Sequence, residues 1–121
     1  MSFEFHPEAD EELISAVAYY EGVEQGLGLD FSREVYASIQ NAADYPNLWP
    51  IIDPEIRRSL VHRFPYGVLY SIESTGIFII AVMHLHRDPD YWKQRDRTCG
   101  SARSDKNQGR QSVTQIKYEV R

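Results

Sequence analysis

The chain has 121 residues and one cysteine, Cys99, so it suits a single domain without internal disulfides, and it has no zinc-finger spacing of Cys and His. Residues 1–95 carry 7 Lys and Arg against 15 Asp and Glu, whereas residues 96–121 carry 6 against 3, and this acidic body argues against broad nucleic-acid binding through phosphates. With no signal peptide and no apolar run of membrane-spanning length, we expect a soluble cytoplasmic protein that uses no cofactor.

The chain begins with a short predicted strand and a helix. "SFEFH" alternates aromatic and polar residues, as a half-buried strand does. Pro7 suits a first helical turn, the carboxylates that follow suit the positive end of a helix dipole, and Leu13, Val17 and Tyr20 repeat at helical spacing. We expect this helix to end near Gly22.

A second amphipathic helix is predicted after a short, glycine-rich connection. Phe31, Val35 and Ile39 mark its apolar face, and we expect Asp30 to cap its N-terminus. Pro46 disfavours helix at Tyr45, so the helix should end there at the latest. The short connection predicts that the two helices form an antiparallel hairpin.

Three strand candidates follow an irregular, proline-rich linker, "YPNLWPIIDPE". They run over residues 57–64, 66–73 and 77–85, and the short connections "PYG" and "STG" predict an antiparallel meander. The last strand is apolar on both faces, which indicates a central strand. The predicted order is β-α-α-β-β-β in one domain over residues 1–95, and residues 96–121 are expected to form a flexible polar tail.

Two histidines end the last predicted strand. His84 and His86 point to the same face, because residues two apart in a strand do so. A metal site would need a third ligand, and Asp88 or His62 would have to be brought near. Nothing in the sequence secures that ligand, so we predict no metal site and favour ordinary hydrogen bonds.

The residues after this strand also contain the ingredients of an RNA-cleaving cluster. Attack by a ribose hydroxyl needs a base, an acid and cations for the phosphate charge. The candidates for these roles are His84, His86, Arg87, Tyr91 and Arg95. The alternative is that Tyr91 and Trp92 simply pack the end of the domain onto the sheet.

The first strand of the meander supplies three further cations. Strict alternation places Arg57 and Arg63 on one face and Arg58 on the other. They can be solvated, can pair with the many carboxylates of this chain, or can bind a carboxylate-rich partner through the planar guanidinium.

Five consecutive stretches resemble the RelE/ParE superfamily of toxins from type II toxin-antitoxin modules, most closely its ParE, or plasmid-stabilisation, branch. They are "ADEELISAVAYYE", "GLGLDFSREVYASI", "YPNLWPII", "IRRSLVHRFPYGVLYSIE" and "IIAVMHLHRDPDYWKQR", and the resemblance extends from Phe3 to Arg95. It implies an α+β fold with a helical hairpin packed on an antiparallel sheet, in agreement with the predicted order. It also implies a cognate antitoxin with a segment that folds on the toxin, for which the "IFIIAVM" strand and the helical hairpin are candidate receiving surfaces.

The resemblance leaves the target open. Ribosome-dependent ribonucleases of the superfamily have a basic body, with an arginine where Gly67 stands here, although Arg87 and Tyr91 match that branch. ParE-like members are similar in lacking the catalytic set and bind DNA gyrase. We therefore favour a gyrase-binding, non-enzymatic toxin over an mRNA endoribonuclease that would use His84, Arg87 and Tyr91, with a degenerate, non-toxic module member as a third hypothesis. The residues expected to contact the target or the antitoxin are Arg57, Arg58, Arg63, His84, His86, Arg87, Tyr91, Trp92 and Arg95.

Overall fold

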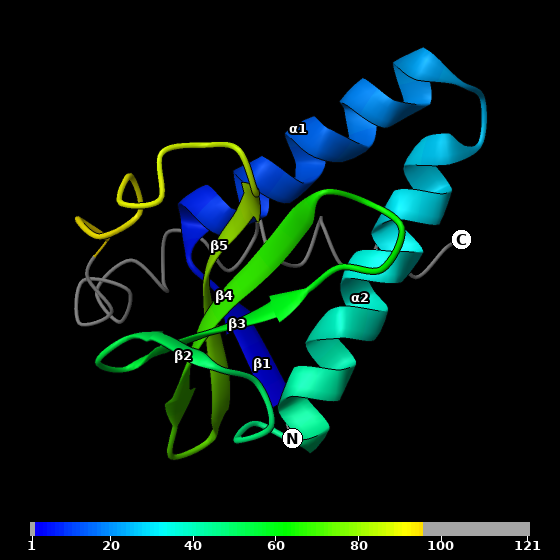
Figure 1. The fold of residues 1–121 in the computed structure, drawn as a ribbon. Helices are drawn as coiled ribbons and strands as arrows, with labels where there is room; N and C mark the ends of the chain where they lie inside the picture. Colours follow the sequence, from blue (N-terminus) through cyan, green and yellow to red (C-terminus); the bar gives the residue numbers. More distant parts are fainter. Residues whose placement is uncertain (1, 96–121) are drawn as a thin grey trace.

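Two helices lie on one face of a five-stranded sheet in the computed structural model, which describes residues 2–95 (Figure 1). The elements in chain order are β1 (Ser2–Phe5), α1 (Pro7–Val23), α2 (Leu27–Asp44), β2 (Ile51–Asp53), β3 (Ile56–Leu60), β4 (Tyr66–Glu73) and β5 (Gly76–His84). The predicted order and fold class are confirmed, with one strand added. The predicted tail lies outside the described residues.

The sheet has the order β1-β5-β4-β3-β2, so β5 is an inner strand as its apolar sequence predicted. The meander of β3, β4 and β5 is antiparallel, whereas β1 pairs in parallel with β5, with Phe3 opposite Ile77. The sheet is therefore mixed rather than wholly antiparallel. The proline-rich linker is not irregular throughout, because Ile51–Asp53 form β2 on the outer edge of β3.

The start of α2 differs from the predicted one. The helix begins at Leu27, after Gly26 in the left-handed conformation with φ of 88°, and Asp30 lies within its first turn rather than at the cap. The carboxylate of Glu21 accepts hydrogen bonds from the backbone N–H groups of Gly26 (2.9 Å) and Gly28 (3.0 Å). Glu21, at the end of α1, thus satisfies a free N–H of the next helix, and no cap from Asp30 is needed.

The strand predicted over residues 57–64 ends early. β3 stops at Leu60, and the chain turns through Arg63, which has a positive φ of 75°. Alternation therefore applies to Arg57 and Arg58 but not to Arg63, so the shared face predicted for Arg57 and Arg63 is wrong.

Two hydrophobic cores lie on opposite faces of the sheet. The first, between the sheet and the helices, includes Leu13, Phe31 and Ile39, with Trp49 of the linker packed against it. The second lies on the other face and includes Leu69, Met83 and Trp92. No helix within residues 2–95 is long and apolar enough to cross a membrane.

Candidate functional site

The segment after β5, residues 85–95, turns back along the sheet and is held by Trp92. The Trp92 side chain is only 3% exposed and belongs to the second core, with Tyr91 packed beside it. Short-range backbone hydrogen bonds, such as that from the Arg95 N–H to the Trp92 carbonyl (3.0 Å), keep the segment in successive turns. Burial of the indole removes a large apolar surface from water and fixes the side chains on either side of it.

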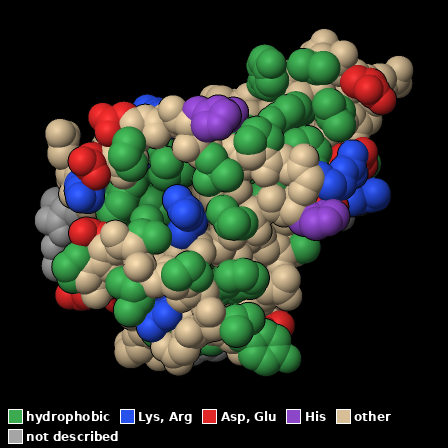
Figure 2. Space-filling view, viewed as in Figure 1, with side chains coloured by type: hydrophobic (Ala, Val, Ile, Leu, Met, Phe, Trp, Pro, Cys, Tyr) green, Lys and Arg blue, Asp and Glu red, His purple; other side chains and the backbone are tan. Residues whose placement is uncertain are grey.

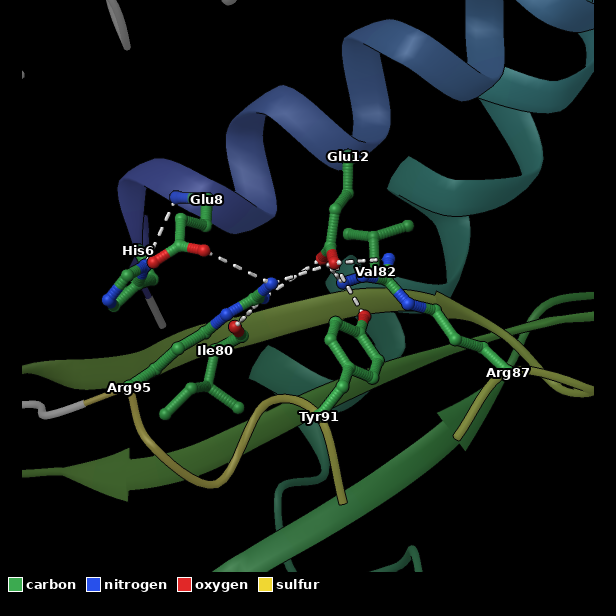
Figure 3. A network of polar contacts seen from close by, with 8 residues as sticks. All are labelled: His6, Glu8, Glu12, Ile80, Val82, Arg87, Tyr91 and Arg95. Atoms are coloured by element: carbon green, nitrogen blue, oxygen red, sulfur yellow. Dashed lines mark hydrogen bonds and ion pairs between the residues drawn. The ribbon is translucent and has the colours of Figure 1, made fainter. Parts of the chain in front are cut away.

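The carboxylate of Glu12, on α1, is the centre to which this segment points (Figure 3). Tyr91 Oη donates a hydrogen bond of 2.5 Å to Oε2, and Arg95 donates from Nη1 to Oε1 (3.0 Å) and from Nη2 to Oε2 (2.9 Å). The Val82 backbone N–H donates to Oε1 (3.0 Å), and Arg87 Nη1 lies 3.4 Å from Oε2. We call Glu12, Arg87, Tyr91 and Arg95 the Glu12 cluster.

The electrostatics of the Glu12 cluster favour a neutral phenol beside charged arginines. Burial and the hydrogen bond to Glu12 raise the pKa of Tyr91 well above its usual range. Burial alone would lower the pKa of Arg95, but the hydrogen bond and negative charge of Glu12 raise it overall. Arg95 also lies 3.6 Å from the Glu8 carboxylate, so two carboxylates face the two guanidinium groups. The charges of Arg87 and Arg95 are largely balanced within the chain.

An open groove of about 400 Å³ runs beside the Glu12 cluster. Glu11 and Tyr19 of α1 line one side, and Tyr66 and His84 of the sheet line the other. The Arg87 guanidinium stacks over the Tyr91 ring at 3.6 Å and lines this groove, with its side chain 52% exposed. Arg87 is therefore the member of the cluster that solvent reaches most easily.

The two histidines interact with each other rather than with a common third ligand. His84 Nδ1 accepts a hydrogen bond from the His86 backbone N–H (3.1 Å), and the His84 ring packs edge-on against Tyr66 at 5.2 Å. Within the described part of the chain, no three His, Cys, Asp or Glu side chains gather as metal ligands would.

The arginines of the meander are dispersed. Arg57 donates to the backbone carbonyls of Asn47 (3.2 Å) and Trp49 (2.7 Å) and so fastens the linker. Arg63 lies at another corner of the molecule, where it pairs with Asp30 at 3.7 Å. Arg58 lies on the face of the sheet opposite the helices. The structure therefore brings Arg87, Tyr91, Arg95 and His84 together and keeps Arg57, Arg58 and Arg63 apart from them.

From the sequence, Glu12 was expected only to complement the helix dipole, so its central place was not predicted. The helical spacing of Glu12 indicates that it lies on the buried side of α1. Glu12 is three residues after Ala9 and four before Ala16, both of which are buried. A carboxylate in that position requires cations or hydrogen-bond donors, and Arg87, Lys93 and Arg95 follow the predicted last strand closely.

Comparison with known proteins gives one family and one fold. The family model described as the ParE toxin of the type II toxin-antitoxin system parDE matches residues 3–89. No curated protein sequence matches the chain. Among solved structures, a chain of the chromosomal ParDE toxin-antitoxin system from P. aeruginosa is similar, with a TM-score of 0.61 and 18% identity. The match covers 71% of the present chain and 97% of that chain, and at this identity it shows a shared fold.

Proposed function

This chain belongs to the family of ParE toxins of type II toxin-antitoxin systems, and from that premise we propose that it inhibits DNA gyrase by binding it, without catalysing a reaction, and that a cognate antitoxin neutralises it. Gyrase as the target comes from the resemblance to the ParE branch. The proposal places the protein in the cytoplasm, where both partners would be found.

The observation that carries the non-enzymatic part of this proposal is the pairing within the Glu12 cluster. Cleavage of RNA would need free cations around the phosphate and a group that exchanges its proton near neutral pH. Arg87 and Arg95 face carboxylates, and the Tyr91 phenol donates to Glu12 with a raised pKa. Of the candidate catalytic set, Tyr91 and Arg87 thus face Glu12, and His84 accepts a hydrogen bond from the His86 backbone N–H.

Two assays separate the alternatives. Purified protein is added to gyrase with relaxed plasmid DNA, and to a translation extract with a defined messenger. We expect inhibition of supercoiling that the antitoxin encoded beside the toxin gene reverses, and an intact messenger. Cleavage of the messenger in translated frames with supercoiling unaffected would replace the proposal with the ribonuclease alternative. Absence of both effects, and of growth arrest on expression, would indicate a degenerate module member.

Substitution at Arg87 provides the matched control for both assays. Arg87→Gln removes the exposed cation of the cluster while the more buried Arg95 stays on Glu12. A ribonuclease that uses Arg87 would lose roughly a hundredfold or more in cleavage rate, because one electrostatic contact to a transition state contributes that much. We expect messenger integrity to be the same with the parental chain and the variant.

A further inference from the structure

Arg58 of β3 stands apart from the other described cations of the sheet and its C-terminal segment. Arg57, Arg63, Arg87, Lys93 and Arg95 each have a carboxylate or carbonyl partner. The Arg58 side chain makes no hydrogen bond or ion pair within the described residues, and its Nε is buried without an acceptor. In a body with twice as many carboxylates as cations, this lack of an internal partner leaves the positive charge of Arg58 available.

The position of Arg58 on the sheet follows from strand register. Arg58 is opposite Leu69 of β4, and cross-strand partners point to the same face. Leu69 belongs to the second core, so Arg58 also lies on the face opposite the helices. In the view of Figure 2, hydrophobic side chains cover much of the surface, and Lys or Arg side chains lie among them.

Because Gly67 has no side chain, the Arg58 side chain has room to lie against the sheet there. A Cβ atom at position 67 would lie 3.0 Å from Arg58 Cδ and 3.1 Å from its Cγ, and 3.4 Å from a methyl carbon of Leu85. The aliphatic part of Arg58 therefore fills the space that a side chain on β4 would otherwise take. Because the stem is packed, the guanidinium has lost much of its conformational freedom before any partner arrives.

Two exposed leucines lie around Gly67 on the same face as the Arg58 stem. Leu60, the cross-strand partner of Gly67, is 54% exposed, and Leu85 is 37% exposed. We call Arg58, Leu60, Gly67 and Leu85 the Arg58 patch. A segment that covered the two leucines would also withdraw the guanidinium from water, where an opposite charge binds it more strongly.

From these observations we propose that the Arg58 patch is a docking site for the cognate antitoxin, and that Arg58 binds an Asp or Glu carboxylate of an apolar antitoxin segment. Charge complementarity selects the carboxylate, because the Arg58 side chain faces no carboxylate within residues 2–95 and its Nε is buried without an acceptor. The two exposed leucines select apolar neighbours on either side of it. The proposal deepens the proposed function, since it requires the antitoxin that the toxin family implies, but it does not require gyrase to be the target.

The test is a titration of each purified full-length toxin variant with the antitoxin encoded beside the toxin gene, at two salt concentrations. Arg58→Gln is expected to weaken binding by roughly ten- to a hundredfold, as the loss of a charge-assisted hydrogen bond does, and to reduce the salt dependence. The matched control is Arg33→Gln, which removes the same charge from an exposed residue of α2 and should change the affinity by no more than about twofold.

A second variant keeps the charge and changes only the position of Arg58. Gly67→Ala adds one methyl group against the Arg58 stem, at a residue whose backbone tolerates alanine. We expect weaker antitoxin binding with an unchanged circular dichroism spectrum. Equal affinity of the parental chain, Arg58→Gln and Gly67→Ala would overturn the inference.

The same variants in the supercoiling assay keep this inference distinct from the proposed function. Weaker antitoxin binding with full gyrase inhibition supports the Arg58 patch as an antitoxin site. Weaker gyrase inhibition with unchanged antitoxin affinity would assign the patch to the target and overturn the inference, while gyrase binding would stand. A parental chain that did not inhibit gyrase would defeat the proposed function alone, because the antitoxin titration would still decide the role of Arg58.

Discussion

Arg95 and Arg58 are both partly buried arginines beside the second core, but only Arg95 pairs with a carboxylate of the described chain. The Arg95 side chain, 7% exposed, is bound by the carboxylate of Glu12. Arg58 lies flat over Gly67 and faces no carboxylate of the described chain. The number of cations in a sequence therefore does not give the number that can bind a partner. Packing of the helices against the sheet pairs some cations with internal carboxylates and leaves others without such a pair.

The largest effect is expected when the charge that binds Arg95 is removed. Glu12→Gln leaves the buried Arg95 guanidinium with only the more distant Glu8 carboxylate, and we expect the free energy of unfolding to fall by about 2–4 kcal/mol. For a domain of this size, that loss corresponds to a drop in Tm of roughly 10 °C or more. Thermal and urea unfolding followed by circular dichroism measure it.

The control for this change is Glu24→Gln, which makes the same substitution at an exposed residue just after α1. We expect it to unfold as the parental chain does. If Glu12→Gln were equally stable, the Glu12 cluster would not contribute to the fold, and its side chains would be free for a partner.

A smaller effect is expected from the phenol of the cluster. Tyr91→Phe removes one hydrogen bond to a carboxylate and should cost about 1–2 kcal/mol in the urea unfolding free energy. Tyr45→Phe, at an exposed tyrosine, is the matched control and should cost nothing measurable. If Tyr91 served only catalysis, its loss would reduce an activity and leave the unfolding curve unchanged.

The fold was more predictable than the Glu12 cluster. Helical and strand periodicities depend on which residues enter the core, and Leu13, Phe31 and Ile39 entered it as predicted. The parallel pairing of β1 with β5 depends on which strands become neighbours after folding, which no local pattern contains. The start of α2 was mispredicted because Glu21, on the preceding helix, took the capping role.

The sequence predicted most residues of the Glu12 cluster, but not the contacts between them. Arg87, Tyr91 and Arg95 were recognised as a group because they are close in sequence, whereas Glu12 lies at least 75 residues away along the chain. Their pairing is a long-range contact, and only the packing of α1 against β5 brings the two together. The binding roles of the nine candidate residues stay predictions.

A second tyrosine, Tyr70, is expected to affect stability at high pH. Tyr70 Oη donates to the Pro46 carbonyl (2.7 Å), and burial raises its pKa to about 12. Because the folded value lies above the ordinary value of about 10, its contribution to stability is complete below pH 10 and is lost as the pH rises towards 12.

Tyr70→Phe tests this titration directly. At pH 8 the variant should be less stable by about 1 kcal/mol, because it loses one hydrogen bond to a neutral acceptor. Between pH 10 and pH 12 the difference in urea midpoint from the parental chain should shrink, since the variant has no phenol to ionise at this position. A constant difference across that range would contradict a raised pKa for Tyr70.

The smallest effect is expected for Arg87, the other cation on Glu12. Its side chain is half exposed and its contact with Glu12 is 3.4 Å, so Arg87→Gln should lower the free energy of unfolding by less than about 1 kcal/mol. Arg95→Gln, measured in the same urea series, should cost clearly more because that guanidinium is buried and makes two hydrogen bonds to Glu12. If the two substitutions were equally costly, burial would not be what separates a structural arginine from an available one in this chain. If they differ as expected, Arg87→Gln is a folded protein in which any change in gyrase inhibition or messenger cleavage reports on contact with the target.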